Sequence, residues 1–97
     1  MTRFEEGKMY WMNGDGWDPL KVISRSKSGQ SVVMKCATGN KSFRVKIRVN
    51  PMRNSEYVVT DSHYSQDSWM WDDVSCYASR PLKDAEQAAW ENLAQKG

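Results

Sequence analysis

The segment from Lys41 to Asn50 alternates apolar and charged side chains, and this alternation constrains the fold more than any other feature of the chain. Its apolar members are Phe43, Val45, Ile47 and Val49, and its charged interior members are Arg44, Lys46 and Arg48. Successive side chains of a strand point to opposite faces. The alternation therefore predicts one strand over 41–50, with the apolar side chains in the core and the cations projecting outward.

Four further runs of strand-forming residues accompany this strand. They lie at 8–12, 17–26, 30–36 and 55–60. Turn residues such as Gly, Asn and Ser lie between the first and second runs and between the second and third. A sixth strand at 74–78 is a further possibility. The connections are too short for crossover helices, so we expect antiparallel pairing in a single curved sheet of five or six strands. Such a sheet is either a meander or a small barrel.

The hydrophobic period changes near the C-terminus, where the sequence predicts a helix over about 81–95. Leu82, Ala85, Ala89 and Leu93 share one helical stripe, with Trp90 at its border. Pro81 suits the first helical position, and we expect the stripe to pack on the sheet because so short a helix is marginal alone. The fold class is α+β. The chain is too short for two independent cores, so 1–97 form one domain, with the sheet at about 8–78.

Positive charge is concentrated in the middle of the chain. Residues 21–53 contain nine Lys or Arg and no acid, whereas acids outnumber bases before and after them. The candidate partner-binding residues on the expected outward face are Arg25, Lys27, Lys35, Arg44, Lys46 and Arg48. Two interpretations remain open. Either this face binds a negatively charged partner, or the acids Asp72, Asp73, Glu86 and Glu91 fold back and neutralise it.

A second candidate surface is the tryptophan-rich segment 68–73. As an extended stretch it places Trp69 and Trp71 on one face and Met70 on the other. Either one face closes over the core, or the segment is an aromatic contact site for a protein partner. Trp69 and Trp71 are therefore candidate partner-binding residues within a predicted loop over 61–73.

The chain shows no spaced set of catalytic or metal-ligating residues. Its single histidine, His63, follows Asp61 and Ser62, and adjacent side chains diverge instead of converging as a catalytic triad must. One histidine and nearby acids match no metal-ligand motif. We therefore expect no enzyme activity, no metal and no small-molecule substrate.

The glycines and cysteines also favour structural roles. Gly14-Asp15-Gly16 precedes a strand and not a helix, so it predicts a turn and not a phosphate-binding loop. Cys36 and Cys76 lack metal-site spacing and are too few for a disulfide framework, which indicates two reduced thiols. We expect no cofactor.

Neither a membrane span nor a secretory signal is expected. The longest apolar run is far too short to cross a bilayer, and the opening residues include Arg3, Glu5 and Glu6 instead of an apolar core. The sequence therefore predicts a cytoplasmic protein.

Short motifs over about residues 4–60 carry a resemblance to known proteins. The motifs are Phe4–Tyr10 (Phe-Glu-Glu-Gly-Lys-Met-Tyr), Lys21–Val33 with its Ile-Ser-Arg, Arg44–Ile47 with its Lys-Ile, and Glu56–Val58. This part of the chain resembles small accessory proteins encoded by bacteriophages and prophages. The tryptophan-rich segment and the alanine-rich helix depart from that pattern. The resemblance implies a non-enzymatic phage protein, such as an anti-CRISPR-like inhibitor of a host complex.

Two functional hypotheses fit these observations. The favoured one is an inhibitor in the host cytoplasm that docks its basic face on an acidic surface of a host protein complex. The formal net charge is only +2, and the acidic C-terminal third would repel a long polyanion. The alternative is a nucleic-acid-binding module, for which salt-dependent binding to DNA or RNA is the diagnostic.

Overall fold

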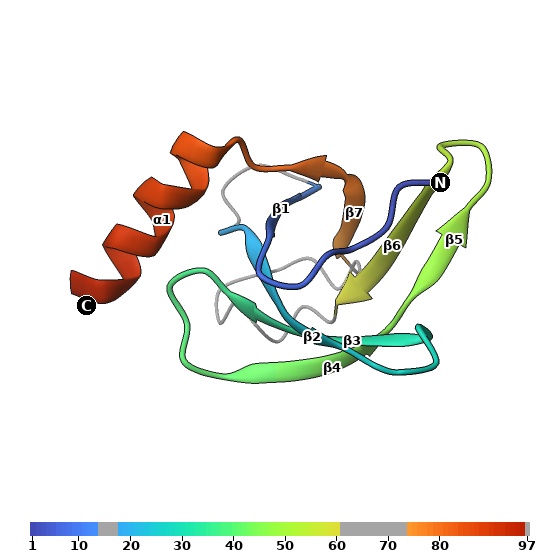
Figure 1. Cartoon of the computed structure of the whole chain (residues 1–97), viewed down its shortest axis with the longest axis horizontal. Coiled ribbons are helices and arrows are strands. Elements are labelled where there is room, and N and C mark those ends of the chain that lie inside the picture. Colours follow the sequence, from blue (N-terminus) through green and yellow to red (C-terminus); the bar gives the residue numbers. More distant parts are fainter. Residues whose placement is uncertain (14–17, 61–73, 97) are drawn as a thin grey trace.

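A computed structural model describes residues 1–13, 18–60 and 74–96 (Figure 1). Its elements are β1 (Met9–Met12), β2 (Leu20–Arg25), β3 (Ser31–Cys36), β4 (Ser42–Lys46), β5 (Arg48–Asn50), β6 (Ser55–Thr60), β7 (Val74–Pro81) and α1 (Asp84–Lys96). The described strands form one sheet in the order β4-β3-β2-β1-β7-β6-β5, and all neighbouring strands are antiparallel. The predicted fold class, one antiparallel sheet with one C-terminal helix, is confirmed, although the sheet has seven strands and not five or six.

The sheet curls into a barrel because its two end strands, β4 and β5, are neighbours in the sequence. Only Ile47 separates them. Its backbone N–H donates to the carbonyl of Gln30, in the register of the ladder between β3 and β4, and from Arg48 onward the chain pairs with β6 instead of β3. The predicted strand over 41–50 is therefore two strands, which supplies the additional strand. The side chains still alternate across Ile47, which is buried.

The barrel interior is filled by apolar side chains from strands on all sides. Its buried residues are Phe4, Tyr10, Met12, Leu20, Val22, Val32, Met34, Ile47, Val58, Cys76 and Ala78. Phe43 and Val45 are partly buried and pack against this core, as the alternation predicts. The prediction that Val49 is core is wrong, because its side chain is 50% exposed. Among the described strands β5 pairs with β6 alone, so Val49 lies on an edge strand of the sheet.

Helix α1 begins later than predicted. Pro81 is the last residue of β7, and the helix starts at Asp84. The Glu86 carboxylate accepts a hydrogen bond from the backbone N–H of Lys83 at 3.0 Å, which satisfies a donor that the first turn leaves unpaired. No helix of the described residues is long and apolar enough to cross a membrane.

The helix contacts the barrel through a different face from the predicted one. Of the expected stripe, Ala85 and Ala89 are exposed and Leu93 is 57% exposed. Instead, Gln87 Oε1 accepts from the Met9 backbone N–H at 3.2 Å, and Gln87 Nε2 donates to the Gly7 carbonyl at 2.8 Å. Trp90, on the same face as Gln87, packs against a small second core of Met9, Ala37 and Leu82. Alanine side chains bury little apolar area, so the glutamine and the tryptophan set the orientation of the helix.

Candidate basic surface

The structure separates Arg25 from the other candidate cations. A β-bulge shifts the register of β2 between Val22 and Ser24, so that Arg25 lies opposite Val32. Residues directly opposite each other share a face of the sheet, and Val32 is fully buried in the barrel. Arg25 therefore points inward, which corrects the expectation that it extends the outward basic face. The extra residue of a bulge leaves no mark in a short sequence pattern.

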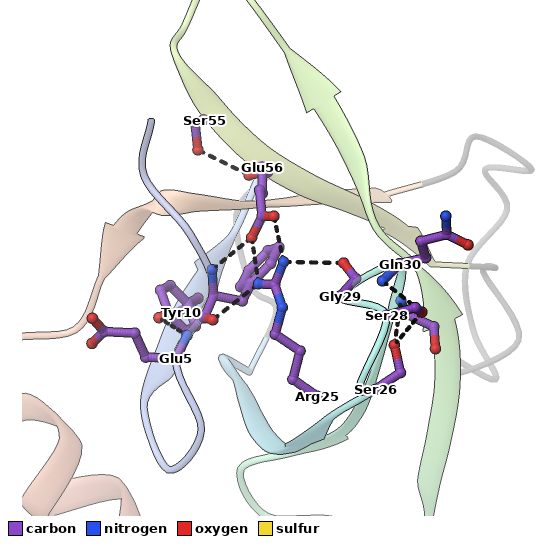
Figure 2. A network of polar contacts seen from close by, with 11 residues as sticks. Glu5, Tyr10, Arg25, Ser26, Ser28, Gly29, Gln30, Ser55 and Glu56 are labelled. Atoms are coloured by element: carbon purple, nitrogen blue, oxygen red, sulfur yellow. Dashed lines mark hydrogen bonds and ion pairs between the residues drawn. The ribbon is translucent and has the colours of Figure 1, made fainter.

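Arg25 and Glu56 form a bidentate ion pair at one end of the barrel interior (Figure 2). Arg25 Nη1 donates to Glu56 Oε1 at 2.7 Å, and Nη2 donates to Oε2 at 2.6 Å. Oε1 also accepts from the Phe4 backbone N–H at 2.9 Å, while the guanidinium donates to the carbonyls of Phe4 and Gly29. The pair thus joins the N-terminal segment, the β2–β3 turn and β6.

The protonation of this ion pair follows from its contacts. Burial on its own raises the pKa of the Glu56 carboxyl, but hydrogen bonds from Arg25 and from the Phe4 amide hold that pKa below its usual value. The hydrogen bond to Glu56 raises the pKa of Arg25. Both groups are therefore charged at neutral pH, and the role of Arg25 in the fold is structural.

Arg44, Lys46 and Arg48, here called the basic row, lie exposed on the outward face of β4 and β5. Arg44 is opposite Val33 of β3, and Arg48 is opposite Tyr57 of β6. Successive members are two residues apart, a step of about 6.6 Å in a regular strand, and Ile47 at the junction of β4 and β5 belongs to neither strand. The three cations therefore follow one another within at most about 13 Å of backbone.

Among the residues that the structure describes, no acid forms an ion pair with the basic row. The ion pairs of this part of the chain are Lys8–Glu5, Lys21–Glu91 and Arg25–Glu56. Arg44 Nη1 donates to the neutral Ser31 hydroxyl at 3.1 Å. Of the four acids expected to neutralise the row, Glu86 accepts a hydrogen bond at the start of α1 and Glu91 pairs with Lys21. The other two lie outside the described residues.

The remaining candidate residues fall in separate places. Lys27 is exposed in the turn between β2 and β3. Lys35 lies on the outward face of β3, opposite Ser42 and beside the basic row, with its Nζ 3.4 Å from the Gly39 carbonyl oxygen. Trp69 and Trp71 lie outside the described residues, so both interpretations of segment 68–73 stay predictions.

A group of side chains that the sequence pattern did not single out adjoins the basic row. On the outward face of β6 and β7 the rings of Tyr57 and Tyr77 stack, with centroids 5.0 Å apart and planes 16° from parallel. The Arg53 guanidinium carbon lies 4.8 Å from the centroid of Tyr77, and Asn50 Nδ2 donates to the Tyr77 hydroxyl at 3.0 Å. We call Asn50, Arg53, Tyr57 and Tyr77 the tyrosine cluster. The alternation of 55–60 predicts that Tyr57 and Val58 lie on opposite faces of the sheet. It does not predict the cluster, which forms only when β6 pairs with β5 and β7.

Both cysteines are free. Burial raises the pKa of the Cys76 thiol to about 12, and burial also raises the pKa of Cys36. A raised pKa keeps each sulfur in its unreactive thiol form at neutral pH. Over the described ranges, no group of three or more His, Cys, Asp or Glu gathers in a geometry suited to a metal ion.

Comparison with protein families, with curated proteins and with solved structures finds no match to this chain. The resemblance to phage accessory proteins therefore stays a prediction. Function is inferred below from the geometry of the basic row and the residues around it.

Proposed function

We propose that this chain is a non-catalytic nucleic-acid-binding protein that holds a phosphate backbone along the basic row. The observation that carries the proposal is the line of Arg44, Lys46 and Arg48, exposed and without an acidic partner among the described residues. Like charges held close together on a sheet repel each other, so a line of three cations is stabilised by an anion bound along it.

The regular spacing of the row favours a polymer of phosphates. The cations recur at every second residue of β4 and β5, and phosphates recur at every nucleotide of a nucleic-acid strand, whereas the carboxylates of an acidic protein surface have no fixed repeat. Two of the three cations are arginines, whose planar guanidinium bonds phosphate through two N–H groups at once.

The described acids of the C-terminal helix do not oppose a polyanion at the β5 end of the basic row. The acidic C-terminal residues argue against a polyanion only if they lie close to the basic row. Helix α1, which carries Asp84, Glu86 and Glu91, lies on the opposite side of the molecule from β5 (Figure 1). Glu91 is in addition paired with Lys21.

Fluorescence anisotropy with labelled dT20 and a labelled 20-base-pair duplex, across a series of salt concentrations, tests this proposal. The triple variant Arg44→Glu, Lys46→Glu, Arg48→Glu is expected to lose binding. For the wild-type chain, three phosphate contacts correspond to a slope of log K against log salt of roughly −2 to −3.

The matched control reverses three exposed cations elsewhere, Arg3→Glu, Arg80→Glu and Lys83→Glu. It changes the net charge by the same amount and is expected to keep most of the affinity. Equal loss of affinity in both triple variants would show that only overall charge matters. Absence of wild-type binding to both oligonucleotides at low salt would disprove the proposal.

A second candidate function is a phage-type inhibitor that docks the basic row on an acidic surface of a host protein complex. One specific observation favours it: Met52, at the turn between β5 and β6, is 96% exposed and lies close in sequence to the half-exposed Val49. Methionine and arginine are both enriched at protein interfaces. A stoichiometric complex with one host protein that survives nuclease treatment, and that both the triple row variant and Met52→Ser abolish, would favour this function over the first. Either function suits the cytoplasm, where free thiols such as Cys36 and Cys76 stay reduced.

A further inference from the structure

We propose, on the basis of the nucleic-acid function above, that the preferred ligand is single-stranded and that one of its bases stacks at the tyrosine cluster. The phosphates of the strand would follow the basic row, and the base would lie at the β5 end of the row. The inference rests on where the cluster lies, how it is held, and which surface it offers.

The tyrosine cluster lies directly beside the last cation of the row. Arg48 is opposite Tyr57 in the register of β5 and β6, and Tyr57 is opposite Tyr77 in the register of β6 and β7. Side chains that are directly opposite share a face, with Cβ atoms about 5 Å apart. A strand bound to Arg48 through a phosphate therefore has the aromatic side chains within reach of the adjacent base.

The cluster is held rigidly by the turn between β5 and β6. Asn50 Oδ1 accepts hydrogen bonds from the backbone N–H groups of Met52 at 3.0 Å and Arg53 at 3.3 Å, while its Nδ2 donates to the Tyr77 hydroxyl. Asn54 adopts a positive φ of 51°, which completes the tight turn. Because these contacts order Arg53 over Tyr77 before any ligand arrives, little conformational entropy is lost on binding.

The surface that the cluster offers suits a flat ring. Tyr77 is buried between its neighbours, whereas Tyr57 is partly exposed and Arg53 is exposed. A partly exposed tyrosine and a planar guanidinium are the groups on which bases stack in proteins that bind single strands. A duplex keeps the faces of its bases inside its own stack, so only a single strand presents a base to such a surface.

The cluster also has a purely structural interpretation, in which it only stabilises the β5–β6 hairpin. The affinity difference between dT20 and an abasic 20-mer distinguishes the two interpretations, because a purely structural cluster would not affect it. The abasic strand has the same number of phosphates but no bases. We expect the wild-type chain to bind dT20 about 5-fold to 150-fold more tightly than the abasic strand, because stacking of one base is worth about 1 to 3 kcal/mol. The same preference is expected for rU20, since every base has an aromatic face.

Variants of Tyr57 identify the stacking residue. In Tyr57→Leu, the affinities for dT20 and for the abasic strand are expected to differ by less than about 2-fold. The affinity for the abasic strand is expected to stay unchanged, because it depends on charge. Tyr57→Phe is expected to keep the preference. Trp90→Leu, which alters a partly buried aromatic side chain on α1, is the matched control and is expected to change neither affinity. If Tyr57→Leu does not fold, Arg53→Gln is expected to weaken the preference by at least about 2-fold in its place.

The outcomes separate this inference from the proposed function. Equal wild-type binding to dT20 and to the abasic strand overturns the stacking site but leaves the basic row as a phosphate-binding surface. Tighter binding to the duplex than to dT20 overturns the preference for single strands. Absence of binding to every oligonucleotide overturns the proposed function itself.

Discussion

Replacement of Arg25 by methionine is expected to destabilise the fold severely, although the sequence pattern predicts that this side chain lies on the outward basic face. Methionine keeps much of the aliphatic length of the side chain but removes the guanidinium. Glu56, whose side chain is only 6% exposed, then keeps a single hydrogen bond to Oε1, from the Phe4 amide, and loses both bonds from the guanidinium. An uncompensated buried charge is the source of the instability.

The expected magnitude follows from the geometry of the pair. Removal of one partner of a buried ion pair costs about 3 to 5 kcal/mol, against a total stability of about 5 to 15 kcal/mol for a small domain. For a chain of this size, a loss of 3 kcal/mol lowers the melting temperature by at least about 12 °C. The double variant Arg25→Met, Glu56→Leu is expected to recover most of the loss, because it removes the stranded charge as well.

Thermal unfolding followed by circular dichroism at several pH values is the assay. The pKa of Glu56 in the folded chain is held below its usual value, so the pair stabilises the fold above the unfolded-state pKa. That contribution is lost as the pH falls through the folded-state pKa, and the gap between wild type and Arg25→Met should narrow in acid. A single variant that melts within about 2 °C of wild type at neutral pH, or a double variant no more stable than the single one, would refute this reasoning.

Three further outcomes are expected. Met34→Ala removes a fully buried side chain and should lower the free energy of unfolding, measured with denaturant, by about 2 to 5 kcal/mol. Leu93→Ala should change it by less than about 0.5 kcal/mol, because Leu93 is mostly exposed. A large effect of Leu93→Ala would mean that the alanine stripe orients the helix after all. With its pKa raised to about 12, Cys76 should resist iodoacetamide at mildly alkaline pH in the native chain and react once the chain is denatured, as mass spectrometry would show; rapid native alkylation would contradict its burial. Gln87→Ala should speed hydrogen exchange at the Met9 amide while the amides of β3 keep their protection, and unchanged exchange would show that the side-chain hydrogen bond does not hold the helix.

Local geometry accounts for what the sequence predicts well. Alternation over 42–48 places Arg44, Lys46 and Arg48 outward and Ile47 inward, and it does so whichever strands lie on either side. The turn residues likewise predict where most strands end. The antiparallel class follows because no connection is long enough for a crossover.

Contacts between distant segments account for what the sequence does not predict. Arg25 points inward because a bulge changes the register of β2. There it pairs with Glu56 of β6, which is thirty-one residues away in the sequence. Val49 has a core-like pattern but lies on a strand paired on one side only. The orientation of α1 depends on Gln87 reaching the backbone of Gly7 and Met9, and no helical periodicity encodes such a contact.

The two strands that carry the basic row are also the two edges of the sheet. Among the described strands, β4 pairs only with β3 and β5 pairs only with β6, so each has one side without a strand beside it. Such an edge is a template for pairing with a second chain, and charged side chains along it oppose that pairing. Substitution of the row by threonine, a neutral residue with high strand propensity, would therefore favour aggregation, whereas glutamate preserves the protection with the opposite sign. The same three positions that suit a bound phosphate chain thus also discourage the barrel from extending its sheet into a neighbouring molecule.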